Sequence, residues 1–165
     1  MENKLCLAGK IRVQHLREGV VIDEEEVSNL TVNEGLNALL GIMLGGASQI
    51  TTWYLGLFTG NYTVVASDAA ATIAGNSTEA TGYTAGARQQ WNGGSASSQS
   101  ITNSASQASF TFNAIQTIYG AFLVSSSVIN GTSGKMFSGA QFGTAKNVVN
   151  NDVLLLTYTF NAASS

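Results

Sequence analysis

Three stretches of the chain concentrate apolar side chains in the manner of buried β-strands. Residues 51–58 (TTWYLGLF) carry apolar or aromatic groups on both faces, which is typical of a strand buried on both sides. Residues 115–124 (IQTIYGAFLV) and 153–160 (VLLLTYTF) have the same character and suit a pleated sheet. We expect residues 51–58 to form the central strand, with the other two stretches as its sheet partners.

Shorter alternating runs predict the remaining strands. A turn at residues 17–19 joins residues 5–16 to residues 20–27 in an amino-terminal hairpin. Further strands are expected at residues 88–91, where Trp91 closes one end of the core, and at 100–103, 108–112 and 135–142, giving eight to ten in all. Proline is absent and turns are made by Gly, Asn and Ser. This pattern predicts a mainly β fold, an antiparallel two-sheet β-sandwich of the jelly-roll kind.

Helical spacing of apolar residues occurs in one place. The stripe consists of Leu36, Leu39, Leu40, Met43 and Leu44. Thr31 and Glu34 fit a capping box at its start, and Gly45-Gly46 provides a stop. We therefore expect one short amphipathic helix near residues 33–44, lying against the sheet. Its polar face lacks Lys and Arg, which argues against a membrane-surface helix.

Charge is concentrated at the amino-terminal end. Of the seventeen Asp, Glu, Lys and Arg residues, eleven lie in residues 1–34. We expect a single domain, residues 1–165, in which residues 1–27 form a charged hairpin or arm. The weakly charged remainder suits a protein packed against neighbours, and the scarcity of Lys and Arg argues against nucleic-acid binding. No stretch predicts a membrane span or a signal peptide, so we expect synthesis in a cytoplasm.

The sequence offers no catalytic, cofactor-binding or metal-binding pattern. His15 is expected to be an ordinary strand residue, and the single cysteine, Cys6, a small buried apolar one. The acidic run at residues 23–26 has two interpretations, a cation site or a solvated strand edge that discourages unwanted pairing. Its spacing does not match a calcium loop, which favours the edge.

Arg88 is the one basic Lys or Arg side chain in residues 18–134. If it is buried, it needs an acidic partner, because an unpaired charge is costly away from water. Glu79 and Asp68 are the acids nearby in the sequence. We therefore predict an ion pair between Arg88 and one of them.

Several phrases resemble small virion proteins of tailed bacteriophages. They are NLTVNEGLN (29–37), WYLGLFTG (53–60), Arg88 with Trp91, FTFN (110–113), YGAFLVS (119–125) and LTYTF (156–160). The resemblance implies a non-enzymatic capsid cement or decoration protein, which binds outside the major capsid lattice and stabilises the head. Its implied partners are the major capsid protein and copies of itself, as a dimer or trimer, with no nucleic acid and no membrane. Its implied location is the capsid surface of the virion, after synthesis in the host cytoplasm.

Two other functions remain open. A tail-fibre or receptor-binding module would recognise a host cell-surface glycan through polar loops or surface aromatics such as Tyr62, Tyr83 and residues 92–100. A glycan-degrading enzyme would need two carboxylates facing one cleft. The acids available for that role are Asp68, Glu79, Asp152 and the run at residues 23–26. Nothing in the sequence brings two of them together, so the enzyme is the weakest of the three.

Overall fold

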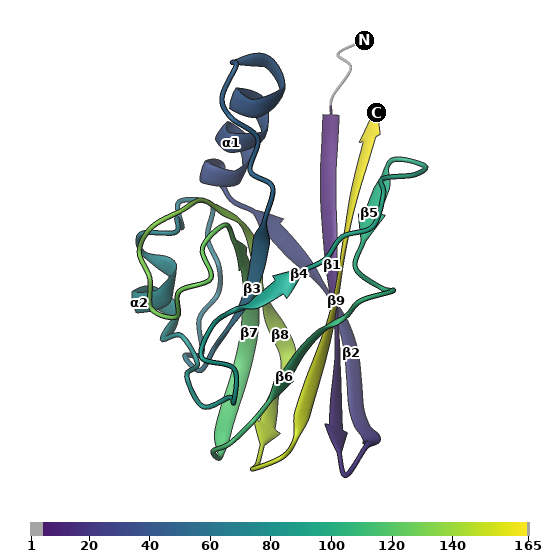
Figure 1. Cartoon of the computed structure of the whole chain (residues 1–165), viewed down its shortest axis with the longest axis vertical. Helices are drawn as coiled ribbons and strands as arrows, with labels where there is room; N and C mark the ends of the chain where they lie inside the picture. Colours follow the sequence, from purple (N-terminus) through teal and green to yellow (C-terminus); the bar gives the residue numbers. More distant parts are fainter. Residues whose placement is uncertain (1–4, 165) are drawn as a thin grey trace.

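The computed structural model describes residues 5–164 and forms one curled antiparallel sheet of nine strands with two helices (Figure 1). Strands account for 49% of the chain and helices for 11%. The mainly β class and the expected number of strands are confirmed. The sheet curls into a half-barrel, and the two stacked sheets of a jelly-roll sandwich are not confirmed.

The order of the strands across the sheet differs from their order in the chain. The elements are β1 (Leu5–Arg17), β2 (Val20–Thr31), α1 (Asn33–Leu44), β3 (Trp53–Phe58), α2 (Ile73–Ser77), β4 (Gln89–Trp91), β5 (Ser100–Thr102), β6 (Ala108–Thr111), β7 (Gln116–Val124), β8 (Met136–Val148) and β9 (Val153–Ser164). Across the sheet they run β4-β3-β7-β8-β2-β1-β9-β5, and β6 also pairs with β9. Residues 1–4 of the expected amino-terminal arm lie outside the described residues.

The central strand is confirmed, but only one of its two expected partners is. Strand β3 pairs with β7, where Leu57 lies opposite Ala121. The pairing expected with residues 153–160 is wrong, because β9 pairs instead with β1, from Leu5 opposite Ser164 to Leu16 opposite Val153. The physical reason is length: β1 offers β9 a ladder twice as long as the six residues of β3.

Both faces of β3 are buried, as its sequence predicts. One face contributes Leu55 and Leu57 to the main core inside the half-barrel. The largest other members of that core are Ile11, Phe110, Phe112, Ile118, Leu154, Leu156 and Tyr158. The opposite face contributes Phe58 to a second cluster with Ile73 of α2 and Phe122 of β7. A fully buried side chain of this kind stabilises the fold by about 1.5–3 kcal/mol.

The turn between β1 and β2 is built on two residues with positive φ, Glu18 at 52° and Gly19 at 78°. This matches a two-residue hairpin turn, whose twist follows that of the strands. The free cysteine near the start of β1, Cys6, is exposed, so its expected burial is wrong.

The acidic run lies where β2 pairs with β1 alone, because the pairing of β2 with β8 is confined to Leu30 and Thr31. Asp23, Glu24 and Glu26 are exposed. Asp23 and Glu25 place carboxylate oxygens 2.7 and 2.8 Å from the ammonium of Lys146, whose side chain is fully buried. On the other face of β2, Glu24 bonds to Arg12. The run therefore lies along a solvated part of β2 that is unpaired on one side, as the favoured interpretation expects, and two of its acids also hold a cation. Alternate acids share one strand face, as a cation site requires, and the cation is a lysine of the same chain.

His15 is a strand residue, as expected; it is also buried and contacts a carboxylate. Its Nε2 lies 2.8 Å from Asp152, which also accepts hydrogen bonds of 3.0 and 2.7 Å from Arg17. The bonds from Arg17, helped by those from His15 and the backbone of Val149, hold the pKa of Asp152 well below its usual range despite its burial. This cluster ties β1 to the turn that precedes β9.

The predicted ion pair of Arg88 is confirmed, with Glu79 as the partner. The guanidinium donates from Nε and Nη2 to the two carboxylate oxygens at 2.7 and 2.8 Å, and both side chains are fully buried. The pair also fixes the loop before β8: Arg88 donates to the carbonyl of Ser126, and Glu79 accepts from the amide of Asn130. Asp68 is bound elsewhere, by Tyr62.

The helix at residues 33–44 is confirmed, but its predicted cap is wrong. Thr31 is the last residue of β2, and Val32 precedes the helix without a side-chain capping bond. The carboxylate of Glu34 does not reach back to the chain before the helix. It accepts from the amides of Ala70 and Met136 at 2.8 and 2.7 Å, and so joins α1 to two other parts of the fold.

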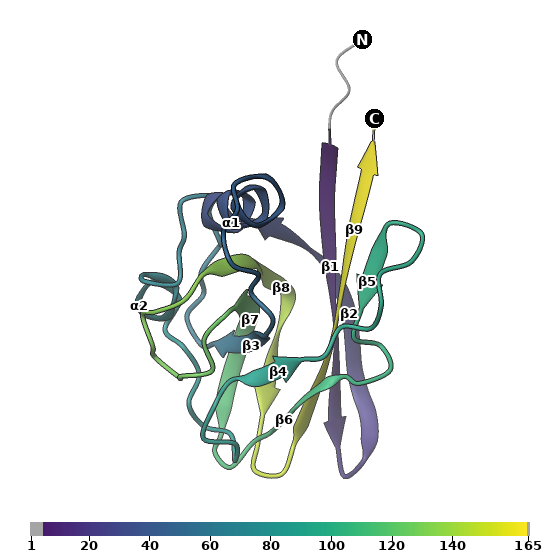
Figure 2. The ribbon, with the colours of Figure 1, turned by 45° about the horizontal axis from the view of Figure 1, so that its top comes forward.

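Leu39 of the apolar stripe faces the sheet, where it lines a cavity with Trp53 and Phe137, but the outer part of the stripe does not, which corrects the predicted packing in part. Leu40, Met43 and Leu44 are 55, 71 and 83% exposed. The buried residue of the helix is Gly35, where an added Cβ would meet the backbone of Phe137 on β8. Figure 2 looks almost along α1 and shows the helix standing outside the curled sheet.

Candidate docking site

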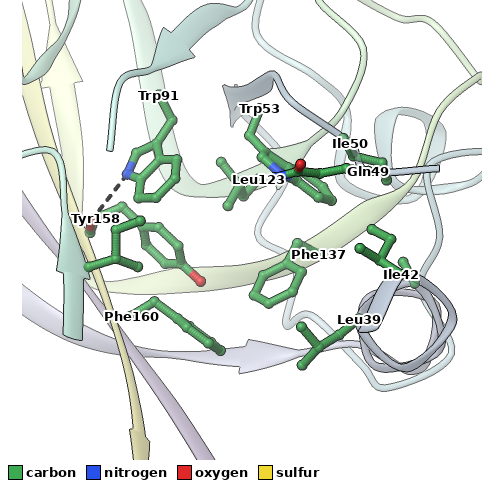
Figure 3. Close-up of a pocket in the computed structure, with 12 residues that line it drawn as sticks. Leu39, Ile42, Gln49, Ile50, Trp53, Trp91, Leu123, Phe137, Tyr158 and Phe160 are labelled. Atoms are coloured by element: carbon green, nitrogen blue, oxygen red, sulfur yellow. Dashed lines mark hydrogen bonds between the residues drawn. The ribbon is translucent and has the colours of Figure 1, made fainter. Parts of the chain in front are cut away.

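An apolar cavity of about 250 Å³ lies where α1 approaches the sheet (Figure 3). We call it the aromatic pocket. It is lined by Ala38, Leu39, Ile42, Gln49, Ile50, Trp53, Trp91, Ile101, Leu123, Phe137, Tyr158 and Phe160. These residues come from α1, the loop that follows it, and six strands of the sheet.

Strand register brings the aromatic side chains together. Trp53 of β3 lies directly opposite Trp91 of β4, and directly opposed residues point to the same face of a sheet. Tyr158 and Phe160 are two positions apart on β9, so they also share a face. Phe137 enters from β8 and lies between the two groups (Figure 3).

The rings contact one another edge to face, which fixes their orientations. Phe137 lies 5.5 Å from Trp53 and 5.0 Å from Phe160 between ring centroids. Trp91 lies 6.1 Å from Tyr158, and its indole nitrogen donates to the Tyr158 carbonyl at 3.2 Å (Figure 3). Such pairs add about 0.5–1.5 kcal/mol each beyond their buried area. The pocket is therefore a rigid and preformed one.

The one ionisable group in the pocket wall is the phenol of Tyr158, which is held neutral. Burial raises its pKa well above the usual range, although hydrogen bonds with Ser138 and Asn29 oppose this effect. The Ser138 hydroxyl lies 2.6 Å from the phenol oxygen, and Asn29 donates to the same oxygen. The lining contains no Asp, Glu, Lys, Arg or His.

A more polar hollow of about 440 Å³ adjoins the aromatic pocket and shares Trp53 and Trp91 with it. Its wall also includes Gln49, Gln90 and Asn92, all three of them exposed. Gln90 alternates with Trp91 on β4, so its side chain points to the face of the sheet opposite the two indoles. The combined site offers an apolar, half-buried floor and an uncharged hydrogen-bonding rim, the composition of a surface that binds a neutral ligand or an inserted side chain.

The structure brings together few of the residues that the sequence suggested for glycan binding. Tyr83 is 3% exposed, and Tyr62 bonds to Asp68, so these two tyrosines do not form a surface platform. Asn92 does lie beside Trp91 in the polar hollow. The sequence pattern places Trp53 only on a strand, and its position opposite Trp91 depends on a strand register that the sequence does not reveal.

Of the carboxylates that a hydrolase could use, Asp23 and Glu25 share the ammonium of Lys146, and the three outside residues 23–26 have separate partners. Glu79 is paired with Arg88, and Asp152 with Arg17. Asp68 accepts from the hydroxyl of Tyr62 at 2.8 Å and from the backbone amide of Val65 at 2.9 Å. Each has a structural partner, and none lines the aromatic pocket.

Two further observations concern the described part of the chain. Within residues 5–164, no three His, Cys, Asp or Glu side chains gather in a group suited to a metal ion. No helix in the same range has the length and hydropathy needed to cross a membrane.

Comparison with known proteins does not assign the chain to a family. No protein-family model matches its sequence, and no curated protein does. The candidate function therefore rests on the aromatic pocket and on the resemblance of the sequence phrases given above.

Proposed function

We propose that this chain is a non-enzymatic structural protein of a tailed-phage virion, a capsid cement or decoration protein that binds outside the major capsid lattice and stabilises the head. The observation that carries the proposal is the aromatic pocket, a rigid uncharged recess beside an exposed helix. A hydrophobic or aromatic side chain of the major capsid protein would fill it.

The physical advantage of such a protein comes from mass action. A copy that binds only the assembled shell stabilises that shell, and the effect grows with the number of copies bound. Residues 35–67 contain no Asp, Glu, Lys, Arg or His. This uncharged region around the aromatic pocket matches the depletion of charge at the centre of protein interfaces.

The remaining features of the proposal follow from the same role. The partners are the major capsid protein and copies of the chain itself, and neither nucleic acid nor membrane takes part. The protein is made in the host cytoplasm and resides on the capsid surface. The two halves of the curled sheet, β4-β3-β7-β8 and β2-β1-β9-β5, would correspond to the two layers of a jelly-roll-like sandwich.

Substituting Trp53→Ala tests the pocket as the capsid contact. Removing the indole deletes one wall of the aromatic pocket, and a hot-spot residue of this kind contributes about 2 kcal/mol or more to binding. We expect roughly 30-fold weaker binding to purified shells that lack the protein, measured by co-sedimentation. Ile115→Ala is the matched control, because Ile115 is an 83% exposed apolar residue outside the pocket. Equal binding by both variants would contradict the proposal.

A second function is favoured by one specific observation, the occurrence of two indoles and two exposed amide residues at one hollow. Trp53 and Trp91 would stack on the apolar face of a sugar ring, and Gln49 and Asn92 would bond to its hydroxyls. This would make the chain a tail-fibre or receptor-binding module for a cell-surface glycan. Virions without the protein would then keep intact heads and fail to adsorb, the reverse of the result expected for a cement protein.

A further inference from the structure

Helix α1 carries a ridge of leucines that the rest of residues 5–164 leaves exposed. Leu36, Leu40 and Leu44 follow one another at intervals of four residues and are 37, 55 and 83% exposed. Met43, beside them, is 71% exposed. Leu39 and Ile42 line the aromatic pocket on another side of the helix. We call Leu36, Leu40 and Leu44 the leucine ridge.

We propose that the leucine ridge is a self-association surface, on which the α1 helices of two copies of this chain pack antiparallel. The inference names the contact for the self-pairing included in the proposed function. The test of this inference measures association of the purified chain alone, so the inference can be wrong while the chain still binds to shells.

The spacing of the ridge is self-complementary. Leu36 and Leu44 are equally far from Leu40 along the helix. In an antiparallel pair that crosses at Leu40, the two Leu40 side chains meet, and Leu36 of each copy meets Leu44 of the other. Residues four apart form one of the natural ridges of an α-helix, and two such ridges interdigitate at a crossing angle of about −50°. A two-fold axis through the contact closes the assembly at two copies.

The leucine ridge has no charged residue that would favour a charged partner over a second copy of this chain. Glu34 is the single charged residue of α1. Its carboxylate is turned to the body of the protein, where it accepts from the amides of Ala70 and Met136 and lies 3.5 Å from the ammonium of Lys135. The outer face of α1 is therefore neutral. A charged partner would find no complement there, whereas a second copy of the same neutral ridge would match it.

The apolar area is sufficient for a dimer. With Met43, and with Leu30 of β2, which is 41% exposed, the ridge presents on the order of 500 Å² of apolar surface, at the upper end for a monomer. Complete burial of this surface on both copies would remove about 1,000 Å² from water, the least that a specific interface buries. A hollow of about 430 Å³ beside the ridge, lined by Leu7, Leu30, Leu36, Leu39 and Leu40 among others, offers room for side chains of the second copy.

The helix is also held rigidly enough to act as a fixed docking element. Gly35 packs against the backbone of Phe137, and the bonds to Glu34 fix the first turn. At the other end, the Gly45 amide donates to the carbonyl of Gly41 at 3.0 Å. Preorganisation of this kind lowers the entropy lost on association.

Sedimentation velocity of the purified chain tests the inference. We expect the wild-type protein to sediment as a dimer, and Leu40→Glu to dissociate it with at least 100-fold weaker association, because a carboxylate would be buried against its own symmetry mate. Ile115→Glu is the matched control, since Ile115 is equally apolar, 83% exposed and not part of α1. It should leave the dimer intact. Circular dichroism would verify that both variants fold.

Cysteine cross-linking tests the antiparallel geometry directly, in a background with Cys6→Ser. Leu40→Cys should form a disulfide-linked dimer on mild oxidation, because the two positions meet. Leu36→Cys should not, because the two copies of residue 36 would lie about 12 Å apart along the helices, beyond the reach of a disulfide. Equal cross-linking by both would overturn the antiparallel pairing. A monomeric wild-type protein would overturn the inference, and loss of shell binding by Leu40→Glu would then assign the ridge to the capsid protein.

Discussion

Substituting Arg88→Met is expected to lower the free energy of unfolding by about 3–5 kcal/mol. Arg88 and Glu79 are both fully buried, and two short hydrogen bonds join them. Removing the guanidinium leaves the Glu79 carboxylate in the core without its partner, and an uncompensated buried charge is among the most destabilising defects in a protein. Urea unfolding followed by tryptophan fluorescence would measure the loss.

Two controls separate the buried charge from the loss of packing. Arg88→Met combined with Glu79→Leu removes both charges, and we expect it to recover most of the lost stability. Arg12→Met breaks a partly exposed pair with Glu24 and should cost less than about 1 kcal/mol. If the single Arg88 variant were no less stable than the Arg12 variant, the buried pair would not have the structural role assigned to it.

The double substitution Asp23→Asn and Glu25→Gln should have a comparable effect, about 3–5 kcal/mol. Both carboxylates contact the ammonium of Lys146, whose side chain is fully buried between β2 and β8. The direct backbone pairing between these strands is confined to Leu30 and Thr31 of β2. Neutralising the acids leaves the ammonium without a counter-charge, so thermal or urea unfolding should occur much earlier than in the wild type.

The converse substitution provides the control. Lys146→Met removes the buried cation and keeps a side chain of similar length, while the Asp23 side chain left behind is 45% exposed to water. We expect Lys146→Met to lower the free energy of unfolding by less than the double acidic substitution does. If Lys146→Met lowered the free energy of unfolding more than the double acidic substitution does, the acids, and not the lysine, would be the groups that burial penalises.

Much of the strand content can be predicted from the sequence, but the pairing of the strands cannot. The strand at residues 53–58 and its burial on both faces follow from the alternation of its side chains. The partner of residues 153–160 does not, because every apolar strand is a suitable neighbour for every other. The choice of β1 over β3 depends on ladder length, because β1 pairs with β9 from Leu5 to Leu16.

The helix shows a second limit of sequence patterns. Its bounds at residues 33–44 follow from periodicity and from the glycines that end it. The same periodicity identifies an apolar stripe but does not say what covers it, and packing against the sheet is one of two possibilities. Here Leu40 and Leu44 face solvent, and we infer that a second copy covers them.

Ion pairs could be predicted from the sequence where a charged residue had few possible partners. Arg88 had two acids nearby in the sequence, so its pairing with Glu79 followed from scarcity and the cost of burial. Lys146 is 123 residues from Asp23, and nothing local links them. The aromatic pocket could not be predicted for the same reason, because it assembles from six strands whose register is a property of the whole fold.

The copy number and location of the protein in purified particles test the central claim most directly. Quantitative mass spectrometry would give the number of copies relative to the major capsid protein, and electron microscopy of particles carrying labelled protein would give their position. The proposal predicts hundreds of copies distributed over the outer surface of the head. A few copies confined to the tail would contradict it and would make glycan recognition through Trp53 and Trp91 the leading function.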